Sequence, residues 1–135
     1  MTSFIWRSRV YWEDTDAGGV GYYANYLKFL ERARTDWLRA RGIVQSELAA
    51  SERVVFAVIE VGIQYLRPAR LDDEVCISCE PQREGAATVK FAQRIWRAAE
   101  PEAPLVEAQI RVACLDAAAF RPRRLPAVVL AEISV

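Results

Sequence analysis

Apolar and polar residues alternate along most of this chain, and one long segment near its start instead follows a helical period. Side chains on a strand point alternately to opposite faces, so the alternation predicts strands at about 4–12, 54–66, 74–80, 87–97 and 105–115. Between the first two strands, apolar residues recur every three or four positions from about Tyr22 to Arg41, which predicts an amphipathic helix. A second, shorter helix is predicted at about 44–50.

The apolar positions within these elements predict the core. The long helix carries one apolar stripe, formed by Tyr22, Tyr26, Phe29, Ala33 and Trp37. The strand at 54–66 carries one nearly continuous apolar face, formed by Val55, Ala57, Ile59, Val61, Ile63 and Tyr65. Residues 127–133 fit either a strand or a short helix.

The order of the elements indicates the fold class. One strand, one long helix and then four strands joined by short connections are typical of an α+β fold, here a single domain over residues 1–135. We expect a five-stranded antiparallel sheet with the helix laid across one face. One helix cannot cover five strands, so a second subunit is expected to bury part of the apolar strand surface.

Composition narrows the class of protein. Hydrophobic residues make up 53% of the chain, and 18 Lys plus Arg balance 18 Asp plus Glu. A net charge of zero gives no long-range attraction to nucleic acid or to an anionic membrane. No apolar run approaches the ~20 residues of a membrane span, and the N-terminus lacks the pattern of a signal peptide. We therefore expect a cytoplasmic protein without nucleic-acid partners or a membrane span.

The sequence contains no histidine and three cysteines. Without histidine, Ser-His-Asp and Cys-His mechanisms and His-ligated zinc are excluded, so a general base must be a carboxylate, a lysine or a metal-bound hydroxide. Cys76 and Cys79 form a C-x-x-C within a predicted strand, where residues three apart point to opposite faces. This favours buried structural thiols over a zinc or redox pair, and we expect no metal site.

An unusual stretch links the first strand to the long helix. Glu13, Asp14 and Asp16 are followed by three glycines and then by the predicted helix start. A helix N-terminus carries unsatisfied N–H groups and a partial positive charge that can receive a developing oxyanion. Asp16 then fits either a catalytic carboxylate or a simple turn or capping acid. For Glu13 and Asp14 we favour structural hydrogen bonds.

The same stretch resembles a known family. Val10-Tyr-Trp-Glu-Asp-Thr-Asp-Ala-Gly-Gly-Val and Tyr23-Ala-Asn-Tyr-Leu-Lys-Phe-Leu-Glu-Arg-Ala-Arg resemble hotdog-fold acyl-CoA thioesterases of the 4-hydroxybenzoyl-CoA thioesterase type, which include the Tol–Pal-associated acyl-CoA thioesterases. Tyr65-Leu-Arg-Pro-Ala-Arg-Leu-Asp-Asp-Glu-Val resembles a later strand and turn of that family. The resemblance implies a sheet wrapped around one long central helix. It also implies hydrolysis of a short-chain or aromatic acyl-CoA, with coenzyme A as part of the substrate and no cofactor.

The resemblance also implies roles for individual residues. Asp16 stands where the family's acid attacks the thioester carbon or activates water, and the backbone N–H of Tyr23 stands where the thioester carbonyl is polarised. Many Tol–Pal-type members have histidine at that second position, so the acyl preference of this chain is open. Substrate contacts are predicted for Gly18, Gly19 and Val20, and Asn25 is expected to shape the site.

Two further groups of polar residues are weaker candidates for substrate contacts. Glu60, on the mixed face of the long strand, is the next carboxylate for a cleft, although it also fits an interface or a solvent-facing position. Arg121, Arg123 and Arg124 form a basic cluster suited to the phosphates of coenzyme A. The same cluster also fits a solvated turn.

The favoured function is acyl-CoA hydrolysis by a homo-oligomer, a dimer or a dimer of dimers, with sites between subunits. Two alternatives stay open at this point. A thioesterase for acyl or polyketide chains on a carrier protein would need the arginine cluster less. A non-hydrolytic acyl-CoA-binding protein would keep the fold without turnover.

Overall fold

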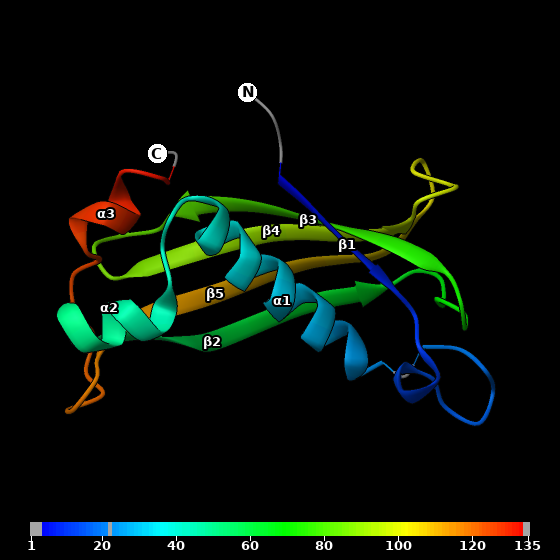
Figure 1. Cartoon of the computed structure of the whole chain (residues 1–135), viewed down its shortest axis with the longest axis horizontal. Coiled ribbons are helices and arrows are strands. Elements are labelled where there is room, and N and C mark those ends of the chain that lie inside the picture. Colours follow the sequence, from blue (N-terminus) through cyan, green and yellow to red (C-terminus); the bar gives the residue numbers. More distant parts are fainter. Residues whose placement is uncertain (1–3, 22, 134–135) are drawn as a thin grey trace.

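The computed structural model describes residues 4–21 and 23–133. Its strands are β1 (Phe4–Arg9), β2 (Val54–Tyr65), β3 (Glu74–Arg83), β4 (Thr88–Arg97) and β5 (Pro104–Asp116). Its helices are α1 (Asn25–Ala40), α2 (Gln45–Ser51) and α3 (Ala127–Leu130). The strands form one antiparallel sheet in the order β1-β3-β4-β5-β2, and α1 lies across one face of it (Figure 1). The expected α+β hotdog arrangement is confirmed.

The core lies between α1 and the sheet. Tyr26, Phe29, Ala33 and Trp37 are all buried, which confirms the predicted helical stripe as far as it is described, since Tyr22 lies outside the described residues. The sheet presents buried residues from its inner strands to this stripe, among them Ile77, Ile95, Val106 and Ile110. The α1-facing positions of β5 are among the best buried in the chain. Alternation therefore predicted the packing of the inner strands correctly.

One polar side chain lies in this core. Gln93 on β4 is 1% exposed, and its Nε2 donates to the carbonyl of Leu30 in α1 at 3.0 Å. Its Oε1 accepts from Nη1 of Arg34 at 3.0 Å. Satisfying both ends of a buried amide removes the cost of desolvating it, and the two bonds fix the rotation of α1 on the sheet.

The first strand and the long helix are shorter than predicted. β1 ends at Arg9 because Trp12–Asp14 forms a 3-10 turn, and α1 begins at Asn25 rather than at Tyr22. An isolated bridge between Thr15 and Gly21 closes residues 15–21 into a turn. A second bridge, between Val20 and Arg70, joins this turn to the segment that precedes β3. The tail forms the short helix α3, one of the two predicted alternatives.

A bulge in β2 overturns the prediction of one continuous apolar face. Val58 pairs with Val112 of β5, but Glu60 pairs with Arg111, so Ile59 is the extra residue and the alternation changes there. Val61, Ile63 and Tyr65 consequently lie on the α1 side, whereas Val55 and Ala57 lie on the outer side. The bulge allows both Phe56 and Ile63 to pack against the core despite their odd spacing.

The cysteines behave as structural thiols. Cys79 belongs to the core beneath α1, where burial raises its pKa to about 12, and Cys76 lies on the opposite face, paired across the ladder with Trp96. Both thiols are free and buried, as is Cys114. Among residues 4–21 and 23–133, no cluster of three acidic, cysteine or histidine side chains is arranged to hold a metal ion. The same residues include no helix that is long and apolar enough to cross a membrane.

Candidate active site

The loop that carries Asp16 is a small closed turn. The N–H of Asp16 donates to the carbonyl of Val20 at 2.9 Å, and the N–H of Gly19 donates to the carbonyl of Asp16 at 3.0 Å. The Oδ1 of Asp16 accepts from the N–H of Gly18 at 2.8 Å. Gly19 has a φ of +75°, a conformation that favours glycine. These bonds hold the Asp16 carboxylate in one orientation relative to its own backbone.

A second set of contacts fixes the loop to the rest of the molecule. The N–H of Gly21 donates to the carbonyl of Ala69 at 2.6 Å, and the N–H of Ala69 donates to the Tyr26 hydroxyl at 2.9 Å. A Cβ at position 21 would lie 2.7 Å from that hydroxyl. The close contact depends on glycine at 21, because an added Cβ would force either the loop or the Tyr26 ring to shift.

The two other acids of the stretch differ from each other in environment. Asp14 is buried, and its Oδ2 accepts from the N–H of Tyr11 at 2.9 Å. Its carbonyl accepts from Nδ2 of Asn25 at 3.0 Å, so Asn25 ties the start of α1 to the acidic loop. Glu13 is exposed. The hydrogen-bonding role expected of Asp14 is confirmed, whereas the same expectation for Glu13 is wrong, because no side-chain bond of Glu13 is found among the described residues.

Asp16 itself is exposed and takes part in none of the ion pairs found among the described residues. It is not a helix cap, because Ala24 occupies the N-cap of α1 and makes no side-chain cap bond. Burial raises the pKa of Tyr26, and the charge of the Asp16 carboxylate contributes to that rise. The carboxylate is thus exposed, and its loop is tied to the first turn of α1 through the bonds from Gly21 to Ala69 and from Ala69 to Tyr26.

Tyr23 lies just ahead of α1, and its side chain is 60% exposed. Its carbonyl accepts from the Tyr65 hydroxyl at 3.3 Å, and the two rings meet edge to face with centroids 6.2 Å apart. Tyr65, at the end of β2, also packs against Tyr26 at 5.6 Å. Tyr65 therefore orients the backbone that carries the candidate oxyanion donor. The sequence did not predict this role of Tyr65.

Two groups of predicted contacts, Glu60 and the three arginines, are not near Asp16 within one chain. Glu60 lies on the outer face of the sheet, opposite α1, where it pairs with Arg111 at 3.5 Å. Arg121, Arg123 and Arg124 lie in the segment before α3, beside α2 and at the far end of the molecule from the Asp16 loop (Figure 1). A single subunit therefore does not bring these four residues together with the acid.

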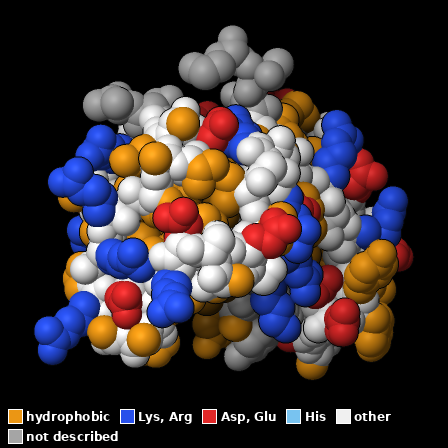
Figure 2. Space-filling model, turned by 60° about the vertical axis from the view of Figure 1, so that its left-hand side comes forward, with side chains coloured by type: hydrophobic (Ala, Val, Ile, Leu, Met, Phe, Trp, Pro, Cys, Tyr) orange, Lys and Arg blue, Asp and Glu red, His pale blue; other side chains and the backbone are white. Residues whose placement is uncertain are grey.

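Arg123 has a structural task at that far end. Its Nη1 donates to the carbonyls of Glu52 and Arg53 at 2.8 and 3.2 Å, beyond the C-terminus of α2, and it lies 3.6 Å from Asp116. Arg121 and Arg124 are exposed. On the face shown in Figure 2, Lys and Arg side chains lie scattered, with Asp and Glu between them. Arg123 is thus engaged in holding this end of the chain together.

Comparisons with known proteins agree with the resemblance seen in the sequence. The family described as Thioesterase superfamily matches residues 18–103. The chain is 45% identical to an acyl-CoA thioester hydrolase YbgC of Escherichia coli, covering 97% of this chain and 96% of that protein. It is 40% identical to an acyl-CoA thioesterase YbgC of Haemophilus influenzae, covering 91% and 88%. A crystal structure of a probable thioesterase from Bartonella henselae superposes with a TM-score of 0.85 at 34% identity, covering 93% and 100%.

Proposed function

This chain belongs to the thioesterase superfamily, and on that premise we propose that it hydrolyses a short-chain or aromatic acyl-CoA to the free acid and coenzyme A. The observation that carries the proposal is the placement of Asp16. Its carboxylate is exposed and bonded within its own turn, on a loop whose Gly21 is tied through Ala69 to Tyr26 in the first turn of α1. A fixed carboxylate next to a helix N-terminus combines a nucleophile or base with donors for a developing oxyanion.

The chemistry follows from these two groups. Asp16 either attacks the thioester carbon, forming a mixed anhydride that water then hydrolyses, or removes a proton from a water that attacks the same carbon. In both routes the C–S bond breaks, and the sulfur leaves as the thiol of coenzyme A once protonated. The carbonyl oxygen gains negative charge in the transition state. The backbone N–H of Tyr23 is proposed to donate a hydrogen bond to that oxygen and so stabilise the charge. Neither route requires a metal or a bound cofactor.

The glycines that follow Asp16 leave no side chains to block the approach of a substrate. Gly18 and Gly19 are exposed and carry no side chain, so a thioester can approach the backbone beside Asp16. Val20 closes the turn, because its carbonyl accepts from the N–H of Asp16 and its backbone forms a bridge to Arg70. These three residues are proposed to contact the thioester end of the substrate. Asn25 is proposed to hold the loop in place through its bond to the carbonyl of Asp14.

The oligomer is proposed from the free edge of β2. This strand has 12 residues and lies at the end of the sheet. Apolar side chains are exposed along it and beside it on α1, namely Val58, Ile59, Val61, Tyr65, Leu66 and Leu27. Long apolar edge strands are normally covered in native proteins. We propose that two copies pair their β2 strands about a two-fold axis, and that dimers associate further into a tetramer as the family resemblance implies.

This pairing would complete the site. Two copies of one strand related by a two-fold axis in a continuous sheet run antiparallel, so the Tyr65 end of β2 meets the Val54 end in the partner. The Asp16 loop, joined to Tyr65 through Tyr23, would then face the α2 end of the partner subunit. The arginines of that end reach a coenzyme A bound at Asp16 only in such a dimer. A cytoplasmic location is proposed because all three cysteines are free thiols.

The test is thiol release from a panel of benzoyl, short-chain and long-chain acyl-CoAs by wild type and Asp16→Asn. Loss of the carboxylate is expected to lower kcat/KM by about 10²–10⁴. Glu13→Gln is the matched control, because Glu13 is an exposed acid three residues away, and it should stay close to wild type. Sedimentation of both variants checks that they assemble alike. Wild-type silence on acyl-CoA, with turnover of an acylated carrier protein, would overturn the proposal.

A further inference from the structure

The segment between β2 and β3, residues 66–73, contacts the turn that carries the catalytic acid. The carbonyl of Ala69 accepts from the N–H of Gly21 at 2.6 Å, and the backbone of Arg70 forms a bridge with Val20. The carbonyl of Val20 in turn accepts from the N–H of the catalytic acid at 2.9 Å. The position of the 66–73 segment therefore sets the position of the acid.

The same segment is joined to the two elements that flank the acid in the sequence. The N–H of Ala69 donates to the hydroxyl of Tyr26 in α1 at 2.9 Å, and both residues are buried. On its other side, the N–H of Val10, just after β1, donates to the carbonyl of Asp73 at 2.8 Å, and the N–H of Asp72 donates to the carbonyl of Val10 at 2.9 Å. A shift of the segment would therefore move the acid relative to α1.

One side chain from the sheet holds both ends of this segment. Arg97 is the last residue of β4, and its Nε donates to Oδ2 of Asp73 at 2.8 Å while its Nη2 donates to the carbonyl of Pro68 at 2.7 Å. The same Asp73 oxygen accepts from the N–H of Arg70 at 2.8 Å. The side chains of Arg97 and Asp73 are only 19% and 23% exposed, so water screens this ion pair less than a surface pair. Arg97 thus links the two residues that flank Ala69 and Arg70.

These contacts depend on the shape of a guanidinium. Its Nε and Nη2 lie in one rigid plane, so they can donate to two acceptors at a fixed separation. A lysine at 97 would keep the attraction to Asp73, but its single ammonium would not hold the carbonyl of Pro68 in the same geometry. Glu100 lies 4.0 Å from Nη1 and its side chain is 56% exposed, so it is no substitute for Asp73.

We propose that Arg97 is a positioning residue for the reaction at Asp16, because it clamps the 66–73 segment that holds the catalytic turn at the start of α1. For its kinetic consequence the inference rests on the proposed function. A displacement of about 1 Å at the reacting atoms can cost about 10² in rate. Loosening the clamp should therefore lower kcat more than it changes KM, since the proposed contacts to the phosphates of coenzyme A lie outside the turn.

The kinetic test compares two substitutions of Arg97. Arg97→Lys keeps the charge and loses the planar pair of donors, and Arg97→Gln loses both. Each is expected to lower kcat by about ten- to a hundredfold on every acyl-CoA that the wild type hydrolyses. Arg94→Lys is the matched control, because Arg94 is an exposed arginine of the same strand and its side chain makes none of the ion pairs found among the described residues. Urea denaturation checks that each variant is folded under assay conditions. A kcat within about twofold of wild type in both Arg97 variants would overturn the inference.

A double mutant separates positioning from a general loss of structure. In Asp16→Asn there is no carboxylate left to misplace, so adding Arg97→Lys should leave the residual rate of thiol release unchanged. A merely structural role would lower the residual rate by the same factor as in the wild type. That additive result would show that Arg97 does not act through the acid.

Amide hydrogen exchange tests the clamp without any substrate. In Arg97→Lys, exchange of residues 15–21, including the N–H of Gly21, should become at least about tenfold faster, while exchange in β5 stays as in the wild type. Arg94→Lys should change neither. Faster exchange throughout the chain, or none at 15–21, would overturn the inference. Full thioesterase activity of Asp16→Asn would instead overturn the proposed function, and the exchange result would still decide whether Arg97 holds the turn.

Discussion

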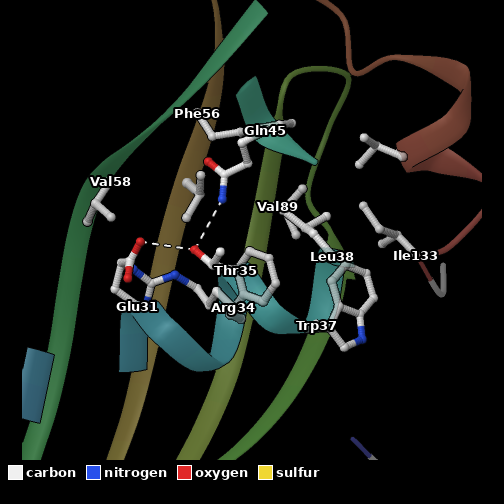
Figure 3. A pocket seen from close by; sticks show the side chains of 13 residues that line it. Glu31, Arg34, Thr35, Trp37, Leu38, Gln45, Phe56, Val58, Val89 and Ile133 are labelled. Atoms are coloured by element: carbon white, nitrogen blue, oxygen red, sulfur yellow. Dashed lines mark hydrogen bonds between the residues drawn. The ribbon is translucent and has the colours of Figure 1, made fainter. Parts of the chain in front are cut away.

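The two ends of α1 are held in different ways. At the N-terminal end, backbone hydrogen bonds within the Asp16 turn and across to Ala69 hold the acidic loop, and glycine permits the close contact with Tyr26. At the other end, apolar side chains from β2, β4, β5, α1 and the α3 segment surround a cavity with a polar rim (Figure 3). One end is specified by backbone geometry and the other by side-chain identity.

This difference assigns different consequences to mutation. Disturbing the N-terminal end moves the carboxylate relative to the helix start, so every acyl-CoA should react more slowly. Disturbing the cavity end removes apolar packing and leaves the Asp16 turn in place, so its main effect should be on stability. Catalytic rate and stability should therefore separate along one helix.

The largest effect on stability is expected at the cavity end, from Trp37→Ala. Trp37 is 2% exposed, packs edge to face on Phe91 and lies beneath the Arg41 guanidinium at 4.5 Å. Its removal should lower the free energy of unfolding by about 3–5 kcal/mol, because a large void forms in the core. Urea denaturation measures the change. Trp12→Ala is the matched control, because Trp12 is 76% exposed, and an equal loss there would contradict the account.

A smaller effect is expected at the catalytic end, from Gly21→Ala. The added Cβ would lie 2.7 Å from the Tyr26 hydroxyl, so the loop must shift. We expect a loss of about 1–3 kcal/mol in stability and a fall in kcat/KM on all acyl-CoAs alike. Adding Tyr26→Phe removes the nearest atom and should restore part of both. Gly62→Ala is the control, because its nearest neighbour lies at 3.9 Å, and an altered acyl preference in Gly21→Ala would break the comparison.

The smallest effect is expected from Glu60→Gln on the outer face of the sheet. Glu60 pairs with Arg111 at 3.5 Å in an exposed setting, and Arg111 keeps Glu84 at 2.6 Å after the change. Solvent weakens such pairs, so kcat/KM should stay within about twofold of wild type. Steady-state kinetics measures this. A loss comparable to that of Asp16→Asn would mean that Glu60 supplies the reacting carboxylate.

The sequence predicted much of this fold because its pattern is local. Strand alternation and one helical period located every strand and both larger helices, and the buried stripe of α1 followed directly from spacing. The bulge at Ile59 escaped prediction because Val58, Ile59 and Val61 are all apolar, so the shift in alternation leaves no trace. The predicted end of the first strand and start of the long helix were wrong by a few residues. The turn at 15–21 that separates them depends on a bridge to Arg70, which is distant in the chain.

The candidate site was predictable only in part, for a related reason. Asp16 stood out because an acid before a glycine-rich helix start is a local pattern with a chemical meaning. Arg97 did not stand out, because its contacts with Pro68 and Asp73 join segments that are distant in the chain. Tyr65 likewise gains its contact with Tyr23 only when β2 and α1 are packed together.

The most direct test of the central claim is a crystal structure with a non-hydrolysable acyl-CoA analogue. The account predicts the Asp16 carboxylate about 3–3.5 Å from the carbon that replaces the thioester carbon. It also predicts the adjacent oxygen within hydrogen-bonding distance of the Tyr23 N–H. A thioester mimic bound away from Asp16, or positioned beside Glu60, would contradict it.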